Sequence, residues 1–214
     1  MRLHRFDIII MDMRNTGKRK NCLQAVLLCA VILLAGCGKK KFNLVPLTGE
    51  PSDMSGYLAL YDEEPVYYDL DVDGMLKAMK QKKSFVVYFG YPECEWCMEV
   101  VPILNQAAKE NEMQVGYINT RSNPEWTKNT QIDGYDDLIQ VIGEYLEYDA
   151  DGVRHLYVPT VFFIREGKVI GYHEGTLEGH NARNRGLDMD EQETLRNIYR
   201  DLFQQLKDPE YTAK

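Results

Sequence analysis

Two cysteines three positions apart close the stretch Tyr88-Phe89-Gly90-Tyr91-Pro92-Glu93-Cys94-Glu95-Trp96-Cys97. The run at residues 84–89 is β-branched and aromatic and is followed by Gly90 and Pro92, so it predicts a buried strand that ends in a loop. After the second cysteine, apolar side chains recur at the spacing of one helical face, at Val100, Val101, Leu104, Ala107 and Ala108. We therefore expect a helix whose N-terminal end lies at Cys94.

This position predicts different roles for the two cysteines. A helix N-terminus favours a thiolate, because it offers unpaired backbone N–H groups and a partial positive charge. A thiolate is the nucleophile of disulfide exchange, so we expect Cys94 to be exposed and to attack a client. Cys97, one helical turn further inside, is expected to be shielded and to resolve the mixed disulfide.

A structural zinc site and a structural disulfide are the alternatives to a redox role for the cysteine pair. A zinc site needs a second cysteine pair or a close histidine pair, whereas the later histidines are scattered at His155, His173 and His180. A purely structural disulfide would close a loop of very few residues and would remove little entropy from the unfolded chain. We therefore expect a redox-active dithiol that uses no metal and no organic cofactor.

Residues 1–36 have the pattern of a cleaved secretory signal peptide. Basic residues precede an apolar run from Leu23 to Ala35, which is too short for a stable spanning helix. The sequence Leu34-Ala35-Gly36-Cys37 resembles the lipobox of bacterial lipoproteins, which implies lipidation of Cys37 on the outer face of the cytoplasmic membrane. An uncleaved anchor is the alternative, and the sequence does not distinguish Met1, Met11 and Met13 as the start.

Removal of the signal peptide leaves a strongly acidic chain. Residues 1–36 contain six Lys/Arg and two Asp/Glu, so the formal net charge changes from −8 to −12. This charge argues against nucleic acid as a partner and against broad adhesion to anionic lipid. Only Lys39-Lys40-Lys41, beside the expected lipid, favours anionic headgroups.

The remaining sequence predicts one domain at residues 61–208, after a tether at 37–60 and before a tail at 209–214. Its expected elements are a strand at 66–68, a helix capped by Asp71 or Asp73, a strand at 114–119, a hairpin at 161–173 and a helix from about 190. A calcium loop from Asp69 is excluded, because Lys80 stands where an EF-hand needs its bidentate glutamate.

Residues 121–157 are expected to form a helical insertion. Asn123-Pro124 predicts a helix start, and residues 136–148 carry apolar side chains at helical spacing beneath an acidic outer face. This helix either packs over the sheet or serves as a partner helix. Residues 149–152 predict a turn rather than a cation site.

The order of elements resembles the thioredoxin superfamily, and three details carry the resemblance. Pro102 lies five residues after Cys97, where the superfamily has a helix-kinking proline. Val158-Pro159-Thr160 opens the hairpin, like the cis-proline loop of the superfamily, and Gly167 and Gly175 match two of its glycines. The resemblance covers residues 65–206 apart from the insertion, and it implies an α/β fold with a central mixed sheet flanked by helices.

The resemblance also implies a client-binding site beside the cysteines. Pro159 would follow a cis peptide bond, and the backbone of Val158 would pair with an extended client segment. Trp96 and Thr160 complete the expected client-binding set. The long interval between Cys97 and Pro159, together with the lipoprotein-like front, is similar to extracytoplasmic thioredoxin-like proteins of Gram-positive bacteria, including bacteriocin transport accessory proteins.

The chain departs from the thioredoxin pattern beside both cysteines. Glu95-Trp96 replaces Gly-Pro, Glu93 replaces an aromatic residue, and Tyr88 occupies the position of a buried aspartate, which leaves proton handling at Cys97 open. Glu93 and Glu95 are expected to disfavour a thiolate at Cys94, although solvent screens exposed carboxylates. On this reasoning a reductase or isomerase is favoured over a strong oxidant.

The sequence therefore predicts a membrane-tethered, extracytoplasmic thiol–disulfide oxidoreductase of protein or peptide clients, with a membrane electron donor as an option. The alternative is a non-catalytic accessory module for bacteriocin or peptide export, in which the cysteines are incidental. The sequence names neither the client nor the direction of electron flow.

Overall fold

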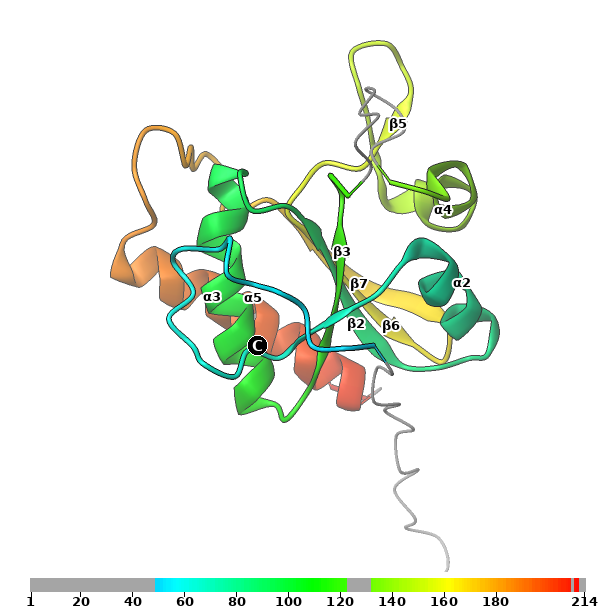
Figure 1. The fold of residues 1–214 in the computed structure, drawn as a ribbon, viewed down its shortest axis with the longest axis horizontal. Coiled ribbons are helices and arrows are strands. Elements are labelled where there is room, and N and C mark those ends of the chain that lie inside the picture. Colours follow the sequence, from blue (N-terminus) through cyan, green and yellow to red (C-terminus); the bar gives the residue numbers. More distant parts are fainter. Residues whose placement is uncertain (1–48, 123–131, 209, 212–214) are drawn as a thin grey trace, which may run out of the picture. The chain divides into compact units, whose positions relative to one another are not determined.

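The computed structural model describes residues 49–122, 132–208 and 210–211 (Figure 1). The signal peptide, Cys37, the first part of the tether, the Asn123-Pro124 helix start and most of the C-terminal tail lie outside the described residues. Within the described part, no helix has the length and apolar character needed to cross a membrane.

A five-stranded mixed sheet forms the centre of the domain. Its spatial order is β1 (Tyr67–Asp69), β3 (Val115–Asn119), β2 (Phe85–Gly90), β6 (Thr160–Arg165) and β7 (Lys168–Glu174). Strand β3 is parallel to β1 and β2, whereas β6 is antiparallel to β2 and β7. Consecutive strands that run parallel need crossover connections, and here α2 (Val72–Lys80) joins β1 to β2 and α3 (Glu95–Glu110) joins β2 to β3.

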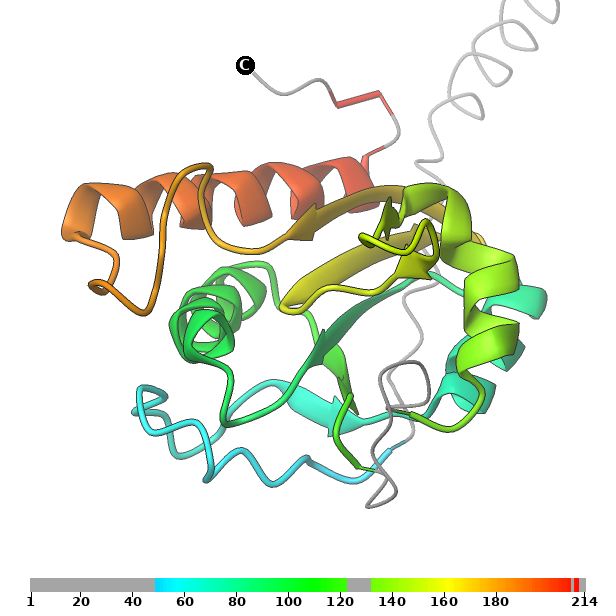
Figure 2. The same ribbon diagram turned by 90° about the horizontal axis from the view of Figure 1, so that it is seen from above.

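Successive strand residues point to opposite faces of the sheet and build two cores. One core lies against α3 and α5 (Met189–Lys207), and its strand residues include Val86, Tyr88, Val115, Tyr117, Val161 and Phe163. The other lies against α2 and α4 (Tyr135–Ile142), and its strand residues include Phe85, Val87, Phe89, Ile118, Phe162 and Ile164. Figure 2 shows these helix pairs on either side of the sheet. The expected α/β fold is confirmed.

Local sequence signals explain where the helices and the hairpin begin. The carboxylate of Asp71 caps α2 by accepting a hydrogen bond from the backbone N–H of Gly74 at 2.7 Å. Asp188 and Glu191 form a capping box at the start of α5. Gly167 turns the hairpin with a φ of 77°, and a Cβ atom there would lie 2.1 Å from the Met79 carbonyl oxygen, so this turn requires glycine.

The described part of the insertion, residues 132–157, contains the expected helix α4 and a small hairpin that the sequence did not predict. Helix α4 ends at Ile142, earlier than the expected residue 148, because a 3-10 turn at Gly143–Tyr145 tightens the chain. Strands β4 (Glu147–Tyr148) and β5 (Arg154–His155) then pair across a turn at 149–152. Strands of two residues give no periodic pattern. Leu138 and Ile142 are fully buried, so α4 packs over the sheet, which is one of the two arrangements that the sequence predicted.

Residues 49–60 pack against the domain, although the sequence predicted a tether there. Met54 is 5% exposed and Tyr57 is 1% exposed. The backbone N–H of Ser52 donates to the Tyr67 carbonyl at 3.0 Å, and that of Asp69 donates to the Glu50 carbonyl at 2.9 Å. The packed domain therefore includes residues 49–60 and does not begin at residue 61. The segment escaped sequence prediction because two isolated apolar anchors on an irregular chain carry no periodicity.

A pair of substitutions tests this packing. Met54→Ala should lower the free energy of unfolding by about 2–4 kcal/mol, because it removes a buried side chain and leaves a cavity. Leu58→Ala serves as the control, because Leu58 is 74% exposed, and it should change stability by less than about 0.5 kcal/mol. Urea unfolding followed by circular dichroism measures both values. Equal, small effects would show that residues 49–60 are not part of the core.

Candidate active site

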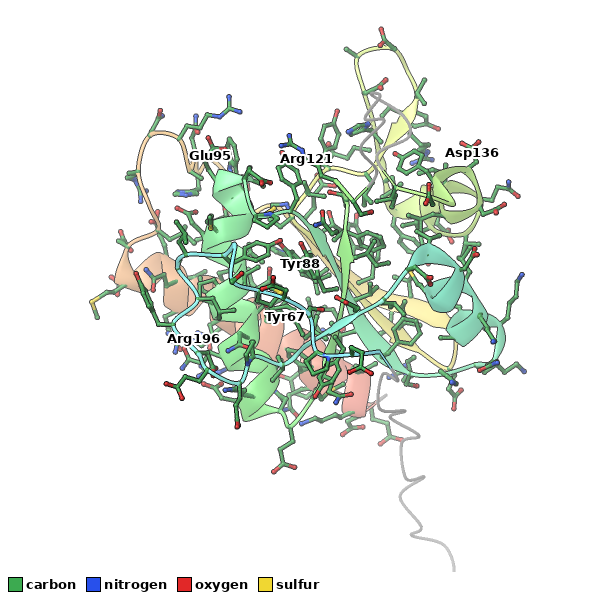
Figure 3. The ribbon with its side chains drawn as sticks, viewed as in Figure 1. Tyr67, Tyr88, Glu95, Arg121, Asp136 and Arg196 are labelled. Atoms are coloured by element: carbon green, nitrogen blue, oxygen red, sulfur yellow. The ribbon has the colours of Figure 1, made fainter. Side chains whose placement is uncertain are left out.

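Cys94 occupies the N-cap of α3, as the sequence predicted. Strand β2 ends at Gly90 and α3 begins at Glu95, so the intervening loop delivers the cysteine to the helix terminus. The Cys94 sulfur accepts a hydrogen bond from the backbone N–H of Cys97 at 3.2 Å, and the backbone N–H of Trp96 also donates to it. Figure 3 shows Glu95, the first helical residue, at this end of α3. The sulfur thus takes the place of a capping side-chain oxygen.

Hydrogen bonding lowers the pKa of the Cys94 thiol below its ordinary value. The largest cause is the hydrogen bond with the Cys97 side chain, which acts against desolvation by burial, and the two backbone N–H groups add to it. Glu95 raises the pKa through its charge but is the last of these effects. Glu95 was expected to disfavour the Cys94 thiolate, but the pKa of Cys94 is lowered. Hydrogen-bond donors in contact with the sulfur change this pKa more than a carboxylate whose charge is screened by solvent.

Burial raises the pKa of the Cys97 thiol well above its ordinary value. The hydrogen bond with Cys94 and the charge of Cys94 act in the same direction. Cys97 is 0% exposed, and both cysteines are free thiols. The pair titrates as a unit, so the site favours a thiolate on Cys94 and a thiol on Cys97.

The expectation that Cys94 is exposed was wrong, since only 5% of the residue is accessible. The loop before β6 lies beside the helix terminus, and the Cys94 thiol donates to the Val158 carbonyl at 3.8 Å. A helix terminus is open to solvent only where no other segment covers it, and a contact across 64 residues leaves no mark in the local sequence. Cys94 is still the more accessible of the two cysteine residues, since Cys97 is 0% exposed.

Strand pairing brings this loop to the cysteines. Antiparallel β2 and β6 place Phe89 opposite Thr160, so the loop after β2 and the loop before β6 lie at the same end of the strands. The Val158–Pro159 peptide bond is cis, as the resemblance implied. Thr160 is fully buried, and its hydroxyl donates to the Tyr157 carbonyl at 2.6 Å. The Thr160 side chain therefore holds the loop and does not face a client.

Aromatic side chains border the cysteines on two sides. Trp96 is half-buried and lines a cavity of about 400 Å³ with Gly175, Thr176 and Leu177. The Tyr91 hydroxyl accepts a hydrogen bond from Arg121 at 2.8 Å, and the guanidinium carbon lies 3.6 Å from the Tyr91 ring centroid. Sequence analysis found Trp96 but not this tyrosine–arginine pair, which only the folded chain brings together.

Tyr88 lies beneath the buried cysteine, at the position where the thioredoxin pattern has an aspartate. Its hydroxyl is hydrogen-bonded to the Cys97 side chain, and burial raises the pKa of this phenol well above its ordinary value. Figure 3 labels Tyr88 together with Tyr67, whose ring centroid is 5.9 Å away. The polar group nearest to the Cys97 thiol from the sheet is thus a phenol.

No group of three or more histidine, cysteine, aspartate or glutamate side chains is placed to hold a metal ion in the parts of the chain that the structure describes. The site consists of two sulfurs, helix amides, a cis-proline loop and phenols. These groups supply acid–base and disulfide chemistry.

No protein-family model and no curated protein sequence matches the chain. Among solved structures, a thioredoxin from Trypanosoma brucei brucei is 16% identical with a TM-score of 0.40, and the match covers 68% of this chain and 97% of that chain. Thioredoxin O2 from Arabidopsis thaliana is 13% identical with a TM-score of 0.36, and the match covers 56% and 88%. The sheet order and the flanking helices described above constitute a thioredoxin-like fold.

Two substitutions that should shift the pKa of Cys94 in opposite directions test this account. Because this pKa is lowered, the thiolate should persist below about pH 8.5 and disappear as the pH falls through the lowered value. Cys97→Ala should raise the midpoint, since it removes the largest lowering contact, and Glu95→Gln should lower it by removing a negative charge. Thiolate ultraviolet absorbance against pH, corrected with Cys94→Ala, measures both. Shifts of the same sign would refute this account.

Proposed function

We propose that this chain is a thiol–disulfide oxidoreductase that acts on protein or peptide clients through Cys94 and Cys97. The observation that best supports the proposal is the contrast within one helical turn. The first sulfur receives backbone hydrogen bonds and has a lowered pKa, whereas the second is buried and has a raised pKa. This contrast is what a nucleophile and a resolving thiol require.

The proposed reaction proceeds in two exchanges. The Cys94 thiolate attacks one sulfur of a client disulfide, so a Cys94–client bond forms and the other client sulfur leaves as a thiolate. Cys97 then loses its proton and attacks the Cys94 sulfur, which releases the second client sulfur and forms the Cys94–Cys97 disulfide. Two electrons pass from the protein to the client, and the two sulfurs are the only redox groups needed.

The Val158 contact links ionisation of Cys94 to client binding. A thiol donates to the Val158 carbonyl, but a thiolate has no proton to donate. Formation of the nucleophile therefore frees this carbonyl to accept a backbone hydrogen bond from an extended client segment. Half-buried Trp96 would contact the client on the other side of the sulfur.

We propose that clients are reduced or isomerised rather than strongly oxidised. The charge of Glu95 works against the Cys94 thiolate, but the hydrogen bonds that lower the pKa of Cys94 outweigh it, so this preference stays an expectation from the sequence. The membrane electron donor is an expectation from the sequence, as is membership among bacteriocin transport accessory proteins.

Covalent trapping tests the roles of the two cysteines. Cys97→Ser should accumulate mixed disulfides with clients, because the attacking thiol remains and the resolving thiol is absent. Cys94→Ser should trap far less, since the remaining Cys97 sulfur is fully buried and has a raised pKa. Non-reducing gels of cells that carry each variant, with Cys37 retained, give the comparison. A reductant should cleave the mixed disulfides and remove the complexes from the gel.

Equal trapping by the two variants would show that the roles are assigned wrongly. A double Cys→Ala variant that keeps full cellular function would instead support the alternative, a non-catalytic accessory module for secretion. In that case the exposed face of α4 in the insertion is the part of the chain to examine.

We also propose that the mature chain is anchored through a lipid on Cys37, outside the cytoplasm. The support is the sequence Leu34-Ala35-Gly36-Cys37 after a basic and then apolar segment. Metabolic labelling with a fatty acid should mark the wild-type protein, and Cys37→Ala should abolish the label while sparing thiol reactivity at Cys94. Label that persists in Cys37→Ala would end this proposal.

A further inference from the structure

Four tyrosines from separate parts of the chain meet in the core beneath α3. Tyr57 comes from the N-terminal segment, and Tyr67, Tyr88 and Tyr117 come from β1, β2 and β3. All four are at most 5% exposed. The Tyr88 and Tyr117 rings are stacked with centroids 5.6 Å apart, and the Tyr57 ring packs edge-on against both.

Three of the four hydroxyls form a continuous hydrogen-bonded chain that begins at Cys97. Tyr88 is hydrogen-bonded to the Cys97 side chain. The Tyr57 hydroxyl lies 3.2 Å from the Tyr88 hydroxyl and donates to the Tyr117 hydroxyl at 3.1 Å. The Tyr67 hydroxyl is engaged elsewhere, because it donates to the Val101 carbonyl at 2.7 Å.

The proton positions give this chain a direction. A phenol carries one proton, and that of Tyr57 is used toward Tyr117, so Tyr88 must be the donor in the contact between Tyr88 and Tyr57. The Tyr88 oxygen is then left to accept from the Cys97 thiol. Each group therefore donates away from the buried sulfur. The last member, Tyr117, lines a cavity of about 900 Å³ beside Asp69 and Asn119.

Cys97 has no direct route for its proton. The residue is 0% exposed, and yet its thiol must lose a proton before the sulfur attacks the mixed disulfide. Cys94 cannot take this proton at that moment, because its sulfur is bonded to the client. Tyr199 from α5 also lies near Cys97, but its hydroxyl has no hydrogen-bond partner among the described residues and so leads nowhere.

We propose that the hydroxyls of Tyr88, Tyr57 and Tyr117 form a relay that removes the proton of Cys97 during resolution, an inference that rests on the proposed function. As the Cys97 sulfur bonds to Cys94 and the Cys94–client bond breaks, Cys97 gives its proton to Tyr88, which gives its own to Tyr57. Tyr57 passes its proton to Tyr117, and Tyr117 gives its own proton to water in the cavity that this residue lines. The client sulfur takes the electron pair, and every hydroxyl is neutral again.

The high pKa values of the phenols favour a relay in which the protons move together, and not one in which a phenolate forms as an intermediate. Burial raises the pKa of Tyr57 and Tyr88 well above the ordinary value and that of Tyr117 to about 12. No phenolate is therefore populated near neutral pH. A hydroxyl that receives one proton as it releases another avoids that charge, which is why a chain of neutral donors suits this buried site.

The experiment uses a small aromatic disulfide that releases a coloured thiolate at each exchange. Cys94 attack gives a first phase whose rate rises with reagent concentration, and resolution by Cys97 gives a second phase that is independent of it. The full chain is mixed with reagent in a stopped-flow instrument, and the signal of Cys94→Ala is subtracted. Absence of both phases in the wild-type chain would refute the proposed function and would leave no resolution step to test.

Tyr88→Phe, Tyr57→Phe and Tyr117→Phe should each slow the second phase by about tenfold or more, as expected for loss of a proton-transfer group, and should leave the first phase within about twofold. The pH at which resolution reaches half its maximum should also rise. Tyr67→Phe is the matched control, because it removes a buried hydroxyl from the same cluster without touching the relay, and it should change neither phase.

Three outcomes would overturn the relay. Unchanged resolution in Tyr88→Phe shows that the hydroxyl is not used. Slowing confined to Tyr88→Phe shows a single hydrogen bond to sulfur and no transfer through Tyr57 and Tyr117. Equal slowing in Tyr67→Phe shows an effect of packing. If Tyr57→Phe or Tyr88→Phe fails to fold, as judged by circular dichroism, Tyr117→Phe against Tyr67→Phe decides the matter.

Discussion

The hydrogen bond from the backbone N–H of Cys97 to the sulfur of Cys94 is the contact on which the rest of the site depends. It exists because α3 starts at that point, and α3 starts there because its apolar stripe must pack against the sheet. The same helical turn that presents the amide also carries Cys97 into the core. The lowered pKa of Cys94 and the complete burial of Cys97 are therefore two consequences of a single helix start.

The register of the sheet brings the second half of the site to this helix. Phe89 pairs with Thr160, and Thr160 pairs with Glu174. The segments that follow β2, precede β6 and follow β7 therefore all lie at the same end of the sheet. Cys94, the cis-proline loop and the wall of the cavity beside Trp96 come from these three segments. A shift of one residue in the pairing of β6 would send the side chains of each core to the opposite face of the sheet and would move the Val158 carbonyl away from Cys94.

The N-terminal segment has two consequences for the domain. It anchors Met54 and Tyr57 in the core, and it supplies the hydroxyl that joins Tyr88 to Tyr117. Gly56 also approaches Pro92 of the cysteine loop so closely that a Cβ atom would lie 2.8 Å from the proline ring. Residues 49–60 are thus part of the support of the cysteine site and not a tether.

The sequence alone determined the elements that depend on neighbouring residues. The buried strand, the cysteine helix, the Asp71 cap, the hairpin around Gly167 and the closing helix each carry a periodic or capping signal within a few residues. The positions of Cys94 at the start of α3 and of Cys97 within its first turn were predicted in the same way, and the prolines that matched a known pattern predicted the cis bond at Pro159.

The tertiary structure alone decided what depends on distant contacts. Cys94 is covered because Val158 lies beside it. Met54 and Tyr57 are buried because their segment forms hydrogen bonds with the edge strand β1, and Tyr88 belongs to a tyrosine cluster that four segments of the chain share. Local patterns carry no information about which segments will meet, because that choice is made by the packing of both faces of the sheet at once.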